Sequence, residues 1–166
     1  TKYWSIQAWV HHPDSEQRFL LDHHRERLDP TEFLEWSHDR QSFSGIADEW
    51  WLNFDRLGVP LRYIIMEKNA AQRWVYGTDA WARWRRLRQV DVIEHETQRN
   101  KADPDYGVQF LLRSVWREGR VRLPGAGIGR IASIRLVDEV TRWPHTPTED
   151  CVMSQWFLEH NLVRLS

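Results

Sequence analysis

Hydrophobic and polar residues alternate at the start of the chain. The stretch KYWSIQAWV (2–10) is rich in residues that favour β-strands, and RFLLD (18–22) is a second apolar run. The sequence HHPDS, which lies between them, is typical of a turn. These two runs therefore predict a β-hairpin.

Apolar residues at helical spacing follow the hairpin. In LDPTEFLEW, Asp29 fits the N-cap position and Pro30 the first helical position. Apolar residues recur at helical spacing from Phe33 to Leu57. We expect a helix that ends near Leu57, where GVP follows, with SFSG (42–45) as the place for a break.

Strands and helices alternate in the rest of the chain. Two short apolar runs, LRYIIME (61–67) and VDVIEHE (90–96), predict strands on either side of a helix over residues 70–88. The elements expected after them are a helix over 103–119 with Asp103 as its N-cap, a short strand at RVRLPG (120–125), and helices over 129–143 and 148–161. This order favours one α/β domain over residues 1–166, with a mixed sheet and helices on both faces.

The strand in YIIMEKN ends on a charged residue. A buried carboxylate is costly unless it has a partner, so the position of Glu67 predicts that it faces a metal ion. Glu149 and Asp150 open the helix in TEDCVMSQWF, whose apolar residues are spaced to pack on the sheet. The first turn of that helix would then be aimed at Glu67. In the alternative interpretation, the two acids only complement the positive end of the helix dipole.

Carboxylates on rigid elements suit the hydrolysis of phosphodiesters by two divalent ions. Such ions lie about 3.5–4 Å apart, so that one activates water and the other stabilises the leaving oxygen. Mg²⁺ and Mn²⁺ prefer oxygen ligands. The candidate carboxylates therefore predict a site for Mg²⁺ or Mn²⁺.

Charge is nearly balanced, with 23 Lys and Arg against 24 Asp and Glu and a net charge of -1. Any surface that binds nucleic acid must therefore be local. The stretch WARWRRLRQ (81–89) is one candidate, because Arg83, Arg85, Arg86 and Arg88 could bind DNA phosphates. The alternative is an ordinary solvated helix face.

Cysteine, tryptophan and histidine usage points to no further site. The one cysteine, Cys151, excludes an internal disulfide, and we expect it and the 11 tryptophans in the core. Paired histidines at 11–12 and 23–24 lack the companion ligands of a zinc site, so we expect them on the surface. The chain has no apolar run long enough to span a bilayer and no signal-peptide pattern. These features indicate a soluble intracellular protein with no membrane partner.

Five segments, in this order, resemble one protein family: IIMEKNAAQ, RNKADPDYGVQFLL, REGRVRLPG, LVDEVTRWP and TEDCVMSQWF. Together they resemble the C-terminal nuclease domain of the large terminase subunit of tailed bacteriophages, clearly over residues 61–162 and more loosely before them. The resemblance implies an RNase H-like fold and an endonuclease that uses two divalent ions to cut concatemeric double-stranded viral DNA during packaging. It also implies the host cytoplasm as the location, and as partners the terminase ATPase domain, the small terminase subunit and the portal. The chain has no Walker A motif, so that motor would lie elsewhere.

The family's metal ligands map onto three acidic positions. Its strand-borne glutamate corresponds to Glu67 and its late aspartate to Asp150, and Glu149 is an auxiliary neighbour. We expect the loop that follows the strand VDVIEHE (90–96) to bind the scissile phosphate through Lys101 and Arg99. The residue expected to orient Glu67, or to contact the DNA backbone, is Asn69.

The sequence departs from the family pattern at its start. The family carries a further aspartate on the first strand, and its fold has three strands before the first helix. Only two strands are predicted here, and neither holds an acid at the matching place. We expect that the sequence begins after that first strand, so that this chain alone should not hold a normal two-metal site. Two alternatives stay open: a non-catalytic DNA-binding and docking module of a packaging motor, and another RNase H-like nuclease such as a junction resolvase.

Overall fold

The computed structural model describes residues 4–97, 100–103 and 107–165 of the chain. It is a mixed α/β structure, which confirms this part of the predicted fold class. The chain forms two compact units: the terminal unit, Thr1–Arg27 with Thr97–Ser166, and the central unit, Leu28–Glu96. The single domain stays a prediction.

A mixed three-stranded sheet forms the base of the terminal unit. Strands β1 (Trp4–His12) and β2 (Gln17–Glu26) are antiparallel, as the alternating pattern predicts, and the register shifts between Ala8 and Trp9. Strand β7 (Val121–Arg122) adds to the other edge of β2 in parallel. The predicted hairpin and the predicted short strand are therefore both confirmed.

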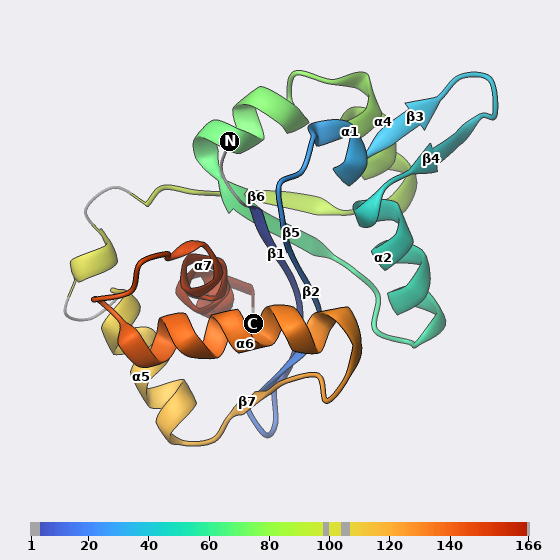
Figure 1. Ribbon diagram of the computed structural model, residues 1–166. Helices are drawn as coiled ribbons and strands as arrows, with labels where there is room; N and C mark the ends of the chain where they lie inside the picture. Colours follow the sequence, from blue (N-terminus) through green and yellow to red (C-terminus); the bar gives the residue numbers. More distant parts are fainter. Residues whose placement is uncertain (1–3, 98–99, 104–106, 166) are drawn as a thin grey trace. The chain divides into compact units, whose positions relative to one another are not determined.

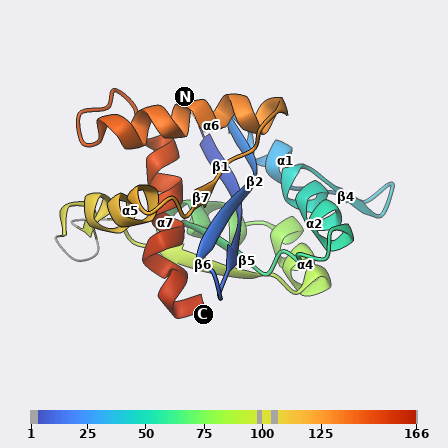
Figure 2. The same cartoon turned by 90° about the horizontal axis from the view of Figure 1, so that it is seen from below.

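Three helices pack around this hairpin: α5 (Val108–Arg117), α6 (Gly127–Arg142) and α7 (Asp150–Leu165). Helix α6 contacts β2, α7 contacts β1, and α5 contacts α7. Helix α6 lies in the plane of Figure 1, where α7 is seen end-on, and α7 lies in the plane of Figure 2, so the two helices cross. The start of α7 is thus held between the hairpin and α6.

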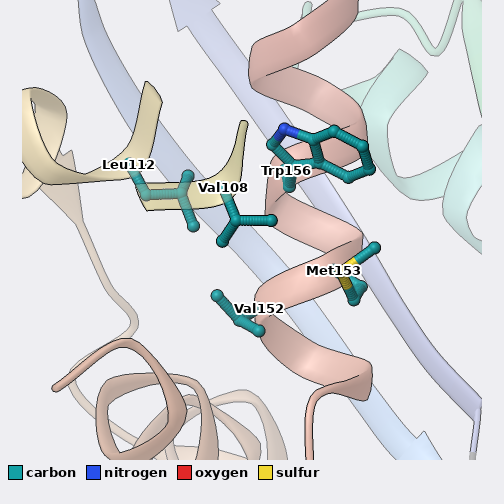
Figure 3. Close-up of a cluster of buried hydrophobic side chains, with 5 residues drawn as sticks. All are labelled: Val108, Leu112, Val152, Met153 and Trp156. Atoms are coloured by element: carbon teal, nitrogen blue, oxygen red, sulfur yellow. The ribbon is translucent and has the colours of Figure 1, made fainter. Parts of the chain in front are cut away.

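Apolar side chains fix α7 against its neighbours. Val108 and Leu112 of α5 pack on Val152, Met153 and Trp156 of α7, as Figure 3 shows. Trp156 and Val152 are fully buried. The helical spacing of apolar residues in the sequence predicted that both side chains lie in the core. Burial of such side chains makes α7 a rigid support for the residues of its first turn.

A buried ion pair fastens the far half of α7 to β2. Arg18 donates to both carboxylate oxygens of Glu159, over 3.0 and 3.1 Å. Both side chains are buried, so removal of either one would leave an uncompensated charge in the interior.

The central unit contains a parallel strand pair and a separate hairpin. Strands β5 (Tyr63–Glu67) and β6 (Asp91–His95) form the parallel pair, and both lie where the two apolar runs predict strands. The other elements are α1 (Pro30–Phe33), β3 (Glu35–Ser37), β4 (Ser42–Ser44), α2 (Ile46–Arg56), α3 (Lys68–Ala70), the π-helical turn η1 (Ala71–Val75) and α4 (Asp79–Arg88). Within the described residues the strands fall into three separate sheets, so the only mixed sheet is β1-β2-β7.

Aromatic side chains fill the core of the central unit. Phe33 and Trp81 lie 5.3 Å apart between ring centroids, and Trp81 lies 5.7 Å from Trp84. Trp84 and Trp81 are almost completely buried. The expectation that tryptophans fill the core is confirmed here and at Trp156.

The predicted helix to Leu57 is wrong over its first half. Asp29 does form a capping box, but the helix that it opens, α1, ends at Phe33. A hairpin formed by β3 and β4 then precedes α2. The polar stretch between β3 and β4 forms the turn of this hairpin. Gly45 begins α2 with a φ of 115°, and a Cβ there would lie 2.5 Å from the Phe33 carbonyl oxygen.

Other helix boundaries also differ from the predicted ones. The stretch 70–88 is not one helix, because η1 and the residues before Asp79 interrupt it. Helix α5 begins at Val108 with Gly107 as its N-cap, so Asp103 does not cap it. Helix α7 begins at Asp150 rather than at residue 148 and runs past the predicted end at 161.

Candidate functional site

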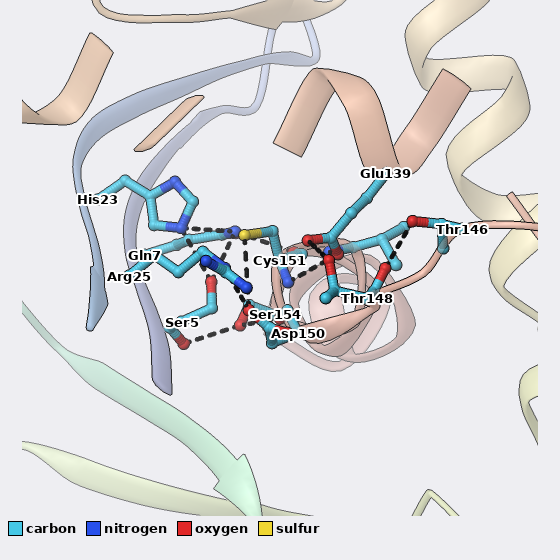
Figure 4. Close-up of polar contacts among 11 residues, drawn as sticks. Ser5, Gln7, His23, Arg25, Glu139, Thr146, Thr148, Asp150, Cys151 and Ser154 are labelled. Carbon is cyan, nitrogen blue, oxygen red and sulfur yellow. Dashed lines mark hydrogen bonds and ion pairs between the residues drawn. The ribbon is translucent and has the colours of Figure 1, made fainter. Parts of the chain in front are cut away.

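The Asp150 carboxylate lies at the start of α7, in contact with the hairpin. Arg25 of β2 donates from Nε to Asp150 Oδ2 over 2.6 Å (Figure 4). The Asp150 side chain is 25% exposed and that of Arg25 is 14% exposed. A charge-assisted hydrogen bond in this sheltered position holds the carboxylate in one orientation.

A second carboxylate reaches the same turn from α6. Glu139 is completely buried, and one of its oxygens accepts from the backbone amides of Cys151 and Val152, over 3.0 and 3.1 Å. Its other oxygen accepts from the Thr148 hydroxyl over 3.2 Å. Burial raises the pKa of the Glu139 carboxyl, and the Val152 amide opposes this rise. Glu139 therefore supplies the cap that the first turn of α7 requires.

Three ligand atoms converge here, one each from Glu139, Asp150 and Cys151. They lie within 4.8 Å of one another, so this group could hold a metal ion. The two carboxylates fit a hard divalent ion, whereas the cysteine does not, because burial raises the pKa of its thiol and keeps it protonated. An ion bound by both carboxylates would replace donors that Asp150 and Glu139 hold in this structure.

Polar contacts with β1 and β2 fix the same turn. Gln7 donates to the Cys151 carbonyl over 2.9 Å, and the Ser154 hydroxyl donates to the Ser5 carbonyl over 2.8 Å. The Ser5 hydroxyl lies 2.9 Å from Nε2 of His23. His23 is fully buried, so its expected surface position is wrong, and burial lowers its pKa to about 4.

Lys101 lies beside the acidic pair in the terminal unit. It belongs to the short 3₁₀ turn η2 (Asn100–Ala102), and its ammonium lies 2.7 Å from a Glu149 carboxylate oxygen. Both side chains are substantially exposed, so this pair contributes little to stability. The structure thus joins Lys101, Glu149 and Asp150 in one place. Arg99 lies outside the described residues.

Glu67 and Asn69 belong to the central unit. Glu67 is the last residue of β5 and its side chain is exposed, as is that of Asn69 in α3. The premise that a buried carboxylate ends this strand is therefore wrong, because Glu67 faces solvent and has no burial cost to offset. The role of Glu67 as a metal ligand stays a prediction that rests on the family resemblance.

One of the arginines of α4 supports the core of the central unit. Arg88 Nε lies 3.0 Å from Oδ1 of the buried Asp48, which also accepts from Nε1 of Trp84 over 2.9 Å. The Arg88 guanidinium lies 4.2 Å from the ring centroid of Trp51. Arg88 is thus a structural residue as well as a candidate for DNA binding.

Two of the three other arginines of α4 are more accessible than Arg88. Arg83 and Arg86 are exposed and Arg85 is half-buried. The Arg83 guanidinium lies 5.0 Å from the Trp36 ring centroid, and that of Arg85 lies 5.5 Å from the Tyr76 ring centroid. Stacking on aromatic faces leaves the charge of Arg83 available at the surface, so DNA binding by α4 stays a prediction.

Glu139 and Arg25 were not predicted as site residues from the sequence. Glu139 follows Leu136 by three positions and precedes Val140, and this places an acid within the apolar face of α6. An acid on a buried face needs donors, so this position carried a usable signal. No comparable signal marks Arg25, because its partner is 125 residues away.

Among the described residues, no helix combines the length and the hydropathy that crossing a bilayer requires. No family model, curated protein or solved structure matches the chain.

Proposed function

We propose that the chain is the divalent-metal-dependent endonuclease domain of a terminase large subunit, with an RNase H-like fold, and that it cuts concatemeric double-stranded viral DNA. The observation that carries this proposal is the place of Asp150. Its carboxylate opens a firmly packed helix and lies within reach of a second carboxylate, that of Glu139. The family resemblance assigns its late metal ligand to this same residue.

Each residue has a defined part in the proposed site. The family resemblance assigns Asp150 and Glu67 as ligands of Mg²⁺ or Mn²⁺, and Glu149 as an auxiliary ligand. A bound divalent ion supplies Lewis-acid activation of the scissile phosphate. Glu139 fixes the first turn of α7, and Arg25 orients the Asp150 carboxylate. The residues proposed to contact DNA are Lys101, Arg99, Asn69, Arg83, Arg85 and Arg86.

The biological setting follows from the same resemblance. The substrate is double-stranded DNA, and the partners are the terminase ATPase domain, the small terminase subunit and the portal. Cleavage would take place in the host cytoplasm during genome packaging. A nearly neutral chain binds DNA through local cationic surfaces, which suits cleavage without strong base readout.

A non-catalytic DNA-binding module is the second candidate. One observation favours it: the carboxylates that would bind a metal already accept hydrogen bonds within the chain. Asp150 accepts one from Arg25, and Glu139 accepts three. A module of this kind would keep these contacts permanently as structural ones. It would bind DNA and would show no cleavage with any metal.

Plasmid cleavage separates these two candidates. Supercoiled plasmid is incubated with the chain and Mg²⁺, Mn²⁺ or EDTA, and nicked and linear products are measured. A version extended at its N-terminus by one strand is tested in parallel, since the resemblance places a further aspartate there. The nuclease proposal predicts metal-dependent products that Asp150→Asn and Glu67→Gln abolish while DNA binding is retained.

Asp138→Asn is the matched control, because Asp138 is a half-buried acid of α6 whose side chain is 38% exposed and pairs only with Arg142 among the described residues. It should cleave like the unmodified chain. Absence of metal-dependent cleavage from both lengths, with DNA binding intact, would reject the nuclease and favour the binding module.

A further inference from the structure

A groove of about 770 Å³ lies along α5 in the terminal unit. Its walls come from η2, from the exposed face of α5 and from the residues that follow α6. A smaller cavity of about 280 Å³ shares Arg113, Arg117 and Trp143 with it, and Leu112 and Val152 contribute to the apolar lining of that cavity. Ligand pockets commonly have volumes of about 300–1,000 Å³, so the groove can hold a ligand of several rings.

The lining of the groove contains three cationic and two acidic side chains. Arg113 and Arg117 are exposed, lie one helical turn apart on α5, and have no carboxylate partner among the residues that the structure describes. The acids of the groove are already engaged: Glu118 pairs with Arg120, and Asp103 has a contact within the chain. The free charge therefore favours an anionic ligand.

An aromatic ring lies on the same face of α5 as the two arginines. Phe110 precedes Arg113 by three positions and is 55% exposed. Trp143, at the end of α6, lines both cavities. An accessible ring beside unpaired cations is the combination that binds unpaired nucleic-acid strands, where bases stack on rings and cations hold phosphates.

We propose that this groove binds an unpaired DNA strand, with Arg113 and Arg117 on successive phosphates and a base stacked on Phe110. Lys101 lines the groove and also pairs with Glu149, which directly precedes Asp150, so the groove adjoins the carboxylates. This inference rests on the proposed function, because it treats the bound strand as part of the substrate of the proposed nuclease. An acidic protein segment would use the same arginines but would not need an exposed ring, so the nucleic acid is favoured.

Binding of a labelled oligothymidylate of about twelve nucleotides, measured by fluorescence anisotropy in EDTA, tests the groove without any cleavage. The double variant R113A/R117A should lower the slope of log Kd against log salt concentration by about 1.4, since each phosphate contact on a single strand contributes about 0.7. Phe110→Ala should weaken binding by a factor of about 5 to 150, the range for loss of one stacked base.

Matched controls come from the exposed face of α6. Arg130→Ala removes an exposed arginine and Ile131→Ala an exposed apolar side chain outside the groove, and neither should change Kd by more than about twofold. Equal effects of the groove and control variants would overturn the proposal. It would also be overturned if a polyglutamate peptide bound through Arg113 and Arg117 while the oligothymidylate did not bind.

The groove and the nuclease can fail separately. Oligothymidylate binding that depends on Phe110, with no plasmid cleavage by either the chain or its extended version, would support the groove and reject the nuclease. Metal-dependent cleavage, in a protein whose groove variants bind oligothymidylate as tightly as the unmodified chain, would support the nuclease and reject the groove.

Discussion

Arg25 and Asp150 form an ion pair across 125 residues of sequence, with Arg25 Nε 2.6 Å from Asp150 Oδ2. The pair joins β2 to the first residue of α7, where Glu139 caps the same turn. A cation at this distance performs two tasks in the proposed site. It orients the Asp150 carboxylate, and it competes with a divalent ion for the same oxygen.

Replacement of Arg25 should therefore strengthen metal binding. Arg25→Met keeps most of the side-chain length and removes the charge, so the affinity for Mn²⁺ should rise about three- to tenfold in isothermal titration calorimetry. Asp150→Asn should abolish the binding heat in both backgrounds. Unchanged Mn²⁺ affinity in Arg25→Met would show that Asp150 is not a ligand.

Loss of Glu139 should destabilise the terminal unit. Glu139→Ala leaves the buried amides of Cys151 and Val152 without an acceptor, which should lower the free energy of unfolding by about 2–4 kcal/mol. Glu139→Gln keeps one acceptor oxygen and should lose only about 1 kcal/mol. Urea denaturation measures both values. Similar losses in the two variants would contradict the capping role.

The buried His23 should make stability depend on pH. Its pKa is lowered to about 4 in the folded chain and is near 6.5 in the unfolded chain, so its contribution is fully present above pH 6.5 and is lost as the pH falls through about 4. The wild type should lose about 3 kcal/mol more than His23→Gln between pH 7 and pH 4. Denaturation curves at several pH values measure this difference. The exposed His145, replaced in the same way, serves as the control, and parallel pH profiles for wild type and His23→Gln would disprove the account.

Asp48 should be essential for the core of the central unit. It is buried and accepts from both Trp84 and Arg88, so Asp48→Ala should lower the free energy of unfolding by about 2–4 kcal/mol. Asp55→Ala removes an exposed acid of the same helix and should cost less than about 0.5 kcal/mol. Urea denaturation measures both values, and equal losses in the two variants would refute the role of Asp48.

Local sequence patterns were sufficient to predict the hairpin, the two strands of the parallel pair and, apart from their boundaries, the helices of the terminal unit. Alternation identified β1, and helical spacing identified the buried face of α7, which packs on α5. The patterns failed between Phe33 and Gly45, where apolar residues at helical spacing belong to a hairpin and a short helix. A polar turn and a glycine with positive φ override the spacing there.

The candidate site was predictable only in part. Asp150 was predicted as a candidate metal ligand because it opens a helix with a strongly apolar face. A residue in such a position is held firmly. Arg25 was missed because long-range pairing leaves no periodic signal. Four apolar residues before Glu67 predict a strand that is buried at its end, whereas the Glu67 side chain is exposed.

Asp150 as a ligand for a divalent ion is the central claim, and anomalous diffraction from crystals grown with saturating Mn²⁺ tests it most directly. We expect an anomalous peak at about 2.1 Å from an Asp150 carboxylate oxygen, with the Arg25 guanidinium moved away. A map that shows no Mn²⁺ at Asp150, with Arg25 still paired to it, would contradict the account.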